Sequence, residues 1–162
     1  MTQTIQIGVT FPSMKVMTAT ADGPKEVTTD ELFKGKKVVL FAVPGAFTPT
    51  CSAKHLPGFV QNTSEFAAKG VDTVICMAVN DPFVMRAWAK EQGVDDGMVM
   101  LADGSATLTK ALGLELDLTA RGLGVRSQRF AMVVDDGRVA SLMIEAPGGF
   151  DVSRAEAVLA AL

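Results

Sequence analysis

Cysteine and histidine are scarce in this chain of 162 residues. The two cysteines, Cys51 and Cys76, are too few for a disulfide framework, and a zinc site would lack ligands because His55 is the single histidine. We therefore expect no bound metal and no cofactor. The low cysteine content fits a reducing compartment best, so we expect the protein in the cytoplasm.

Excess positive charge and long apolar runs are missing as well. The chain has 15 Lys and Arg against 18 Asp and Glu, and no basic run, so nucleic-acid binding is not expected. No apolar stretch reaches the roughly 18 residues that a membrane-spanning helix needs. Residues 1–8 lack the basic and apolar regions of a signal peptide, so we expect neither a secreted nor a membrane protein.

The composition is that of a globular domain. Hydrophobic residues make up 48% of the chain and charged residues 20%, which excludes a disordered chain. A single domain over residues 1–162 is the expected organisation, and a chain of this length buries about two-thirds of its unfolded surface.

Apolar runs alternate with helix signals along the chain, without a long linker. This alternation predicts an α/β domain with a mixed central sheet and helices on both faces. The expected strands are 14–20, 25–28, 38–43, 72–79, 98–102, 129–134 and 139–145. The expected helices are 28–35, 51–70, 81–92 and 105–112, with one more at the C-terminus, and residues 114–128 are expected to be irregular.

Local signals mark several of these boundaries. Thr28 with Glu31, and Ser153 with Glu156, have the spacing of capping boxes at helix N-termini. Pro57 is expected to kink the helix over 51–70, because a proline inside a helix removes a backbone donor.

The most informative segment is PGAFTPTC, residues 44–51, between a buried strand and a helix. A thiol at a helix N-terminus faces unpaired backbone N–H groups and the positive end of the helix dipole, so its thiolate is favoured. The alternative is a packed, inert thiol, since free cysteine is often buried. The polar turn before Cys51 favours the reactive thiol.

The segment also lacks the second cysteine of a dithiol motif. A thioredoxin-type oxidoreductase would carry C-x-x-C here, but Thr48 occupies the position of the first cysteine. Exchange between two thiols of one motif is therefore excluded. A lone thiolate beside a hydroxyl suits attack on a small electrophile.

The spacing Pro44-x-x-x-Thr48-x-x-Cys51 resembles the active-site motif of the peroxiredoxins. The longer block FAVPGAFTPTCSAKHLPGF resembles the type II, peroxiredoxin-5-like subfamily. Further similar blocks are GKKVVLF, VNDPFVMRAW, LADGSATLTKALG and GVRSQRFAMVVDDG, so the resemblance covers nearly the whole chain. It implies a thioredoxin-like fold and a thiol peroxidase that reduces hydrogen peroxide and small organic hydroperoxides.

The resemblance also implies a role for each motif residue. Cys51 matches the nucleophilic, peroxidatic cysteine, and Thr48 matches the threonine whose hydroxyl binds the peroxide and the thiolate. Pro44 matches the proline that shields the site from water. Arg129 matches the arginine that stabilises the thiolate and the developing charge, with Arg126 ranked second. Without the resemblance, Thr48 reads as a cap, Pro44 as a strand end and Arg129 as a surface residue.

His55 and Cys76 receive smaller roles. His55 lies four residues after Cys51, on the same helical face, but catalytic Cys–His pairs usually come from separate elements. We expect His55 to be structural or mildly electrostatic, and not the base. Cys76 lies within an apolar strand and is expected to be buried and inert.

Residues 148–153 contain no cysteine, whereas some members of the resembling subfamily carry a resolving cysteine there. The Cys51 sulfenic acid would then react with an external thiol. Relatives of this kind point to glutathione and glutaredoxin, with thioredoxin less favoured, and to a homodimer. Phe47, Phe83 and Trp88 are expected to be core residues or anchors of that dimer contact.

Two alternative functions remain open. One is a peroxide sensor or a non-enzymatic thioredoxin-fold binding module, such as a holdase. The other, a cysteine hydrolase, is weaker because the chain has no histidine on a separate element to serve as its base.

Overall fold

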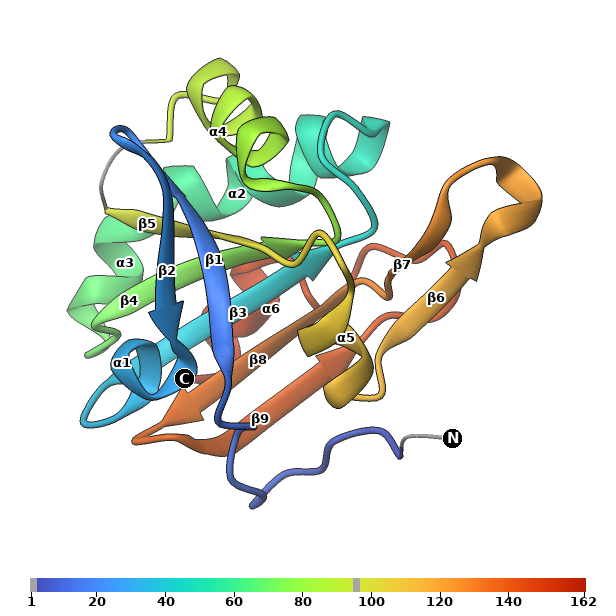
Figure 1. Ribbon diagram of the computed structural model, residues 1–162. Coiled ribbons are helices and arrows are strands. Elements are labelled where there is room, and N and C mark those ends of the chain that lie inside the picture. The colour runs from blue at the N-terminus through green and yellow to red at the C-terminus, as the bar shows by residue number, and fades with distance from the viewer. Residues whose placement is uncertain (1–2, 95–96) are drawn as a thin grey trace.

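The structure, a computed structural model, describes residues 3–94 and 97–162 (Figure 1). Met1 and Thr2, which begin the segment searched for a signal peptide, lie outside the described residues. Seven strands form one mixed sheet in the order β2-β1-β5-β4-β3-β8-β9. The strands are β1 Lys15–Thr20, β2 Gly23–Thr28, β3 Lys37–Val43, β4 Thr73–Ala78, β5 Met98–Ala102, β8 Phe130–Asp135 and β9 Arg138–Ile144.

Strand β3 lies inside the sheet, and this position accounts for its apolar sequence. It pairs in parallel with β4 and antiparallel with β8, and six of its seven residues are buried. A strand buried on both faces has no polar alternation, which is why residues 38–43 form one apolar run. Phe41 packs into the core on one face of the sheet, and Leu40 packs into the core on the other.

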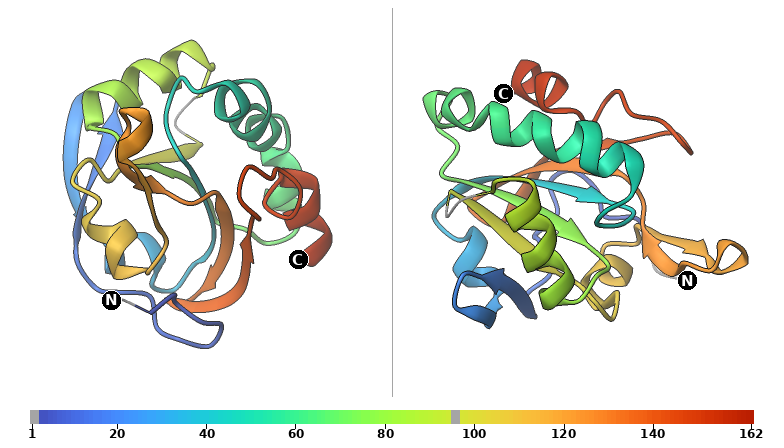
Figure 2. Two further views of the ribbon diagram at one scale, coloured as in Figure 1. Left: turned by 90° about the vertical axis from the view of Figure 1, so that its right-hand side faces the viewer. Right: turned by 90° about the horizontal axis from the view of Figure 1, so that it is seen from above.

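Helices cover both faces of the sheet, as the sequence predicts. The core that contains Phe41 is closed by the helical segment from Cys51 to Ala68 and by α4 Pro82–Glu91 and α6 Ala155–Ala161. Figure 2 shows α6 stacked over this helical segment on one side of the sheet. The other core is closed by α1 Thr29–Phe33, by α5 Thr107–Ala111 and by the N-terminal segment.

The helical segment that follows Cys51 departs from the predicted single helix. It begins with a π-helix, η1 Cys51–His55, in which the Leu56 N–H donates to the Cys51 carbonyl. Pro57 comes directly after this wider turn, and a proline ring crowds the carbonyl four residues earlier in an α-helix. The rest divides at Asn62 into α2 Leu56–Gln61 and α3 Thr63–Ala68, a break that the sequence pattern did not predict.

The prediction that residues 114–128 are irregular is wrong. They form a two-stranded hairpin of β6 Glu115–Leu118 and β7 Gly124–Ser127, joined through the 3₁₀-helix η2 Thr119–Arg121. Figure 1 shows this hairpin as an arm beside the main sheet. Its strands are mostly half-exposed and too short for a strong apolar pattern, and Gly122, in the left-handed conformation, lets the chain turn.

One of the two predicted capping boxes forms. Thr28 and Glu31 cap α1 reciprocally, as expected. The prediction of a capping box at Ser153 and Glu156 is wrong, because α6 begins after Arg154 without a side-chain cap. Ser153 instead donates its hydroxyl hydrogen to the Glu145 carboxylate, a partner that only tertiary structure provides.

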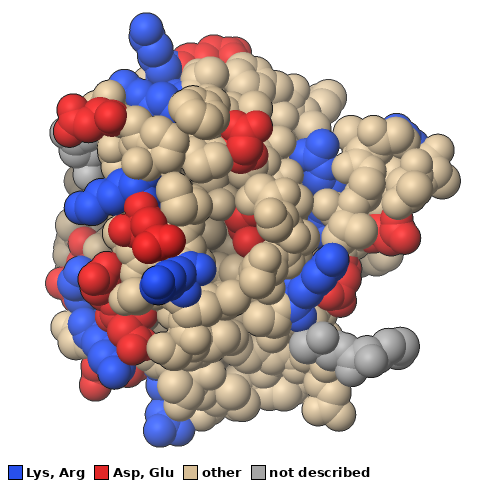
Figure 3. Space-filling model, in the orientation of Figure 1, with Lys and Arg blue, Asp and Glu red and all other residues tan. Residues whose placement is uncertain are grey.

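The surface carries charges of both signs. On the face in Figure 3, Lys and Arg side chains lie interspersed with Asp and Glu side chains and do not merge into one basic patch. Within residues 3–94 and 97–162, every helix is too short or too polar to cross a bilayer.

Candidate active site

The loop between β3 and the first helical turn leads into Cys51 and is held in place by hydrogen bonds. The Ala46 N–H donates to Asn80 Oδ1 at 2.9 Å, which ties the loop to the end of β4. Thr48 donates its hydroxyl hydrogen to the Gly45 carbonyl at 2.6 Å, and the Ser52 N–H donates to the Thr48 carbonyl at 2.9 Å. The loop thus sets Cys51 in the first helical turn.

Two loop residues show how tightly the segment is folded. Phe47 has a φ of 63°, a left-handed conformation that costs energy for a residue with a Cβ atom. A Cβ atom at Gly45 would lie 3.0 Å from Arg126 Nη1 and 3.2 Å from Thr48 Cγ2. The glycine therefore lets the arginine and the threonine approach the loop.

The Cys51 thiol is buried, and it contacts an arginine from a distant part of the chain. Arg129 Nη2 donates to Cys51 Sγ at 3.1 Å. Arg129 directly precedes β8, and the pairing of Ala42 with Phe130 brings it to the end of β3 where the Cys51 loop begins. A guanidinium at this distance stabilises a thiolate more than a thiol.

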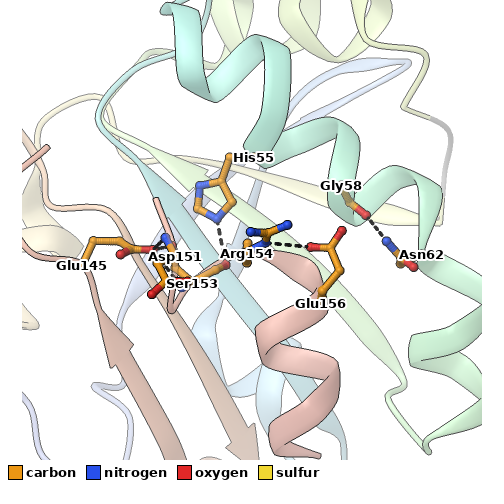
Figure 4. A network of polar contacts seen from close by, with 8 residues as sticks. All are labelled: His55, Gly58, Asn62, Glu145, Asp151, Ser153, Arg154 and Glu156. Atoms are coloured by element: carbon orange, nitrogen blue, oxygen red, sulfur yellow. Dashed lines mark hydrogen bonds and ion pairs between the residues drawn. The ribbon is translucent and has the colours of Figure 1, made fainter. Parts of the chain in front are cut away.

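His55 contacts the same guanidinium from the other side. Arg129 Nη1 donates to His55 Nδ1 at 2.8 Å, and His55 Nε2 lies 2.9 Å from the Ser153 carbonyl oxygen (Figure 4). Arginine can only donate and a carbonyl can only accept, so the ring is neutral with its proton on Nε2. Burial is the main cause that lowers the pKa of His55 from 6.5 to about 4, and the Arg129 charge adds to this lowering, while the Ser153 carbonyl and the Glu145 charge oppose it.

The loop between β9 and α6 supplies the carbonyl that His55 contacts. Glu145 accepts from the Asp151 N–H at 2.7 Å, from the Ser153 N–H at 2.9 Å and from the Ser153 hydroxyl at 2.7 Å. Partial burial raises the pKa of Glu145, but these hydrogen bonds outweigh burial and hold the pKa below its ordinary value. No local pattern links Glu145 to Ser153, so this residue leaves no signal in the sequence.

Aromatic rings line the histidine. The His55 ring lies 5.0 Å from the Phe41 ring and 5.2 Å from the Phe150 ring, centroid to centroid. Arg129 Cζ lies 5.9 Å from the centroid of the Phe150 ring, within the range of a cation–π contact. Apolar rings therefore flank both His55 and the Arg129 guanidinium that contacts the thiol.

Cys76 is buried in β4, as the sequence predicts, and both cysteines are free. Burial raises the pKa of Cys76 well above its ordinary value, and the nearby Cys51 charge raises it further. Cys76 therefore remains a protonated thiol.

The other residues that the sequence singles out have different surroundings. Pro44 is half-buried where β3 ends, and Thr48 lies three residues before Cys51 in the tethered loop. Arg126, the second-ranked arginine, donates to the Leu123 and Val79 carbonyls instead of the thiol. Trp88 is core, with its indole N–H on Ser52 Oγ at 2.9 Å.

No group of three or more His, Cys, Asp or Glu side chains within the described part of the chain is arranged to hold a metal ion. A surface cavity of about 440 Å³ lies between β1, the start of α4 and the start of α5, and none of the residues around Cys51 line it. The chemistry of the site therefore depends on the buried contacts of Cys51 and not on this cavity.

Comparison with known protein families gives one extended match. The family model described as Redoxin matches residues 6–159. Among curated proteins, the chain is 56% identical over 146 residues to Peroxiredoxin-2E-2, chloroplastic, of Oryza sativa, a match that covers 88% of this chain and 65% of that protein. It is 53% identical over 141 residues to Peroxiredoxin-2C of the same organism, covering 87% of each chain.

Solved structures agree with this. A reduced Prx3 in complex with hydrogen peroxide, from Vibrio vulnificus, has a TM-score of 0.92 at 52% identity, covering 97% of this chain and 98% of that one. A putative thioredoxin reductase from Burkholderia cenocepacia has a TM-score of 0.96 at 46% identity, covering 99% of both chains. Both matches extend over the sheet, its helices and the segment around Cys51.

Proposed function

Because this chain belongs to the peroxiredoxins of the redoxin family and is a thiol-dependent peroxidase, we propose that Cys51 is the thiol that attacks the peroxide. The thiolate sulfur bonds to one peroxide oxygen, and the oxygen–oxygen bond breaks. Sulfur is oxidised to a sulfenic acid, while the other oxygen leaves as hydroxide or alkoxide and takes up a proton. The contact of 3.1 Å between Arg129 Nη2 and Cys51 Sγ carries this proposal.

Arg129 is the proposed electrostatic group of the reaction. Negative charge moves from sulfur to the leaving oxygen, and a positive donor beside the sulfur stabilises both ends of that movement. The neutral His55 adds no second positive charge beside the guanidinium. It accepts the hydrogen bond from Arg129 Nη1, which leaves Nη2 to donate to the sulfur. Arg129 is therefore aimed at the sulfur before any peroxide arrives.

Thr48 and Pro44 are the proposed peroxide-binding and shielding residues. The Thr48 hydroxyl donates to the Gly45 carbonyl, so its oxygen lone pairs are available to accept a hydrogen bond from a peroxide. Pro44 has no backbone N–H that would attract water, and its ring restricts the loop. We propose hydrogen peroxide and small organic hydroperoxides as substrates of this site.

The proposed reductant is an external thiol. Cys76 is the other cysteine of the chain, and its burial within the sheet keeps it from resolving the sulfenic acid. One thiol forms a mixed disulfide with Cys51 and releases water, and a second thiol then frees Cys51. Glutathione with glutaredoxin fits this two-step cycle best, and thioredoxin is the alternative.

We further propose a homodimer, in the cytoplasm, of chains that each fold as one domain over residues 1–162. Phe47 is 49% exposed and Phe83 is 73% exposed, which is unusual for large aromatic residues. The segments that carry them follow the neighbouring strands β3 and β4, and the hydrogen bond from the Ala46 N–H to Asn80 Oδ1 links these segments. Two exposed rings on linked segments support an interface between two copies.

The test is peroxide consumption by the reduced protein, with Cys51→Ser beside it. We expect one equivalent of hydrogen peroxide to be consumed rapidly by the wild type and not by the variant. Turnover should continue when glutathione and glutaredoxin are supplied. Consumption no faster than that of a free thiol would contradict the proposed role of Cys51 and would favour a non-enzymatic binding module.

A further inference from the structure

We propose that Glu145 is a positioning residue of the peroxidase site, which acts through Ser153 and His55 on the guanidinium of Arg129. The inference rests on the proposed roles of Cys51 and Arg129, and it assigns a function to a carboxylate that does not touch the thiol. The four residues come from the end of β9, the loop before α6, the helical segment after Cys51 and the start of β8.

The carboxylate of Glu145 fixes the loop before α6. One oxygen, Oε2, accepts three hydrogen bonds, from the Asp151 N–H, the Ser153 N–H and the Ser153 hydroxyl (Figure 4). Hydrogen bonds to an ionised carboxylate are about twice as strong as those between neutral groups. Because two of the three reach Ser153, this residue is held most firmly.

The backbone carbonyl of Ser153 then sets the protonation of His55. It lies 2.9 Å from Nε2, and both residues are fully buried, so no water replaces this acceptor. A ring nitrogen that faces a carbonyl must carry the proton. The position of the Ser153 carbonyl therefore keeps the proton on Nε2 and leaves Nδ1 as a bare acceptor.

A bare Nδ1 is what Arg129 requires. Its Nη1 donates to Nδ1 at 2.8 Å while Nη2 donates to Cys51 Sγ at 3.1 Å. In the other tautomer, Nδ1–H would face the N–H of Nη1, two donors against each other, and the guanidinium would turn away from the sulfur. The tautomer of His55 thus determines whether Arg129 Nη2 points at the Cys51 thiol.

A main-chain hydrogen bond links the first and last residues of this series of contacts, Glu145 and Arg129. The Glu145 N–H donates to the Arg129 carbonyl at 3.0 Å, just beyond the last paired residues of β8 and β9. Glu145 therefore holds Arg129 directly through the main chain and indirectly through Ser153 and His55. Loss of the carboxylate leaves the main-chain contact in place, so its effect should reach Arg129 mainly through the His55 ring.

The same loop brings Phe150 to the site. Its ring lies 5.2 Å from the His55 ring and 5.9 Å from Arg129 Cζ, centroid distances in both cases. Phe150 directly precedes Asp151, the third donor to Glu145. The carboxylate therefore also fixes the aromatic ring that packs against His55 and the guanidinium.

The test uses Glu145→Gln, with Glu156→Gln as the matched control. Glu156 lies close by, at the start of α6, but its carboxylate pairs with Arg154, whereas the Ser153 N–H and hydroxyl donate to Glu145. The single histidine gives an unambiguous ring signal, so nitrogen NMR reads the His55 tautomer directly. The second readout is the rate at which reduced protein consumes hydrogen peroxide.

In the wild type and in Glu156→Gln we expect one neutral tautomer, protonated on Nε2. In Glu145→Gln we expect a mixture of tautomers and an approximately tenfold slower peroxide reaction, the effect of weakening one charge-assisted contact. Ser153→Ala, which keeps the carbonyl but loses the hydroxyl donor, should shift both readouts in the same direction by less. A Glu145→Gln protein that keeps the wild-type tautomer overturns the inference, whether or not its rate falls.

The two readouts also separate this inference from the function on which it rests. If the wild type fails to consume peroxide, the proposed function fails, but the tautomer of His55 still tests the link from Glu145. If peroxide is consumed rapidly and the tautomer of Glu145→Gln is unchanged, the function stands and the role of Glu145 is wrong.

Discussion

Arg129 donates a hydrogen bond to the sulfur of Cys51 at 3.1 Å, although the two residues lie 78 positions apart in the sequence. The antiparallel pairing of β3 with β8 makes this possible, because it sets the beginning of β8 beside the end of β3. The thiol comes from the helical turn that follows β3, whereas the cation comes from the residue directly before β8. The contact between them therefore depends on the assembled sheet.

Replacing the guanidinium tests the contact. In Arg129→Gln, we expect an approximately 100-fold slower reaction with hydrogen peroxide, since a positive donor to the reacting atoms is lost. The rate of peroxide loss measures the effect. Arg126→Gln is the control, because its side chain binds backbone carbonyls. A larger loss in Arg126→Gln would show that the wrong arginine was assigned.

Cys76 should be dispensable for turnover. Cys76→Ser buries a hydroxyl in β4, which we expect to lower the free energy of unfolding by about 1–3 kcal/mol while most peroxidase activity remains. Urea unfolding measures the first effect, and turnover with glutathione and glutaredoxin measures the second. If Cys51→Ser and folded Cys76→Ser lost activity equally, the cycle with one reactive cysteine would be wrong.

Acid should destabilise the protein through His55. The folded state holds this ring neutral down to a pKa of about 4, whereas an unfolded histidine binds a proton near 6.5. The unfolded state binds more protons between these values, so the free energy of unfolding should fall by about 3 kcal/mol as pH drops from 6.5 to 4.

Urea unfolding at a series of pH values measures this dependence. His55→Gln removes the titrating ring, so its free energy of unfolding should fall less over the same interval. Equal slopes in the wild type and in the variant would contradict the assignment of the pH dependence to His55.

The exposed aromatic residues test the proposed dimer. Phe83→Asp places a charge at the start of α4, where the wild-type ring is 73% exposed, and we expect it to convert a dimer into monomers. Sedimentation velocity at equal protein concentrations measures the change. Val9→Asp adds the same charge at another exposed apolar position and should leave the association state unchanged. A wild type that sediments as a monomer would refute the dimer directly.

Gly113 should be one of the least replaceable glycines for stability. It has a φ of +69°, and a Cβ atom there would lie 2.3 Å from the Gln3 carbonyl oxygen. Gly113→Ala should therefore cost the roughly 1–2 kcal/mol of a left-handed backbone and also displace the N-terminal segment.

Gly122→Ala is the matched control for this effect. Gly122 has a similar φ of +75° but open space around the position of a Cβ atom, so only the backbone cost applies. Urea unfolding should give a larger loss for Gly113→Ala. Equal losses would mean that the N-terminal segment yields without cost.

Short windows of the sequence fix the local features of this protein. The apolar run of β3, the reciprocal cap of α1 by Thr28 and Glu31, and the position of Cys51 in a first helical turn all follow from neighbouring residues. Backbone hydrogen bonding and side-chain periodicity act over a few positions, so these features are readable from the sequence.

Tertiary structure alone decided which distant groups meet. Arg126 and Arg129 are three positions apart and chemically equal, yet only Arg129 reaches the thiol, because β7 belongs to the projecting arm and β8 to the main sheet. Ser153 has the spacing of a helix cap, but its hydroxyl donates to Glu145 instead. This contact holds the Ser153 carbonyl beside His55 Nε2. Such choices depend on strand register and loop closure, which sum contributions from the whole chain and leave no mark in any short window.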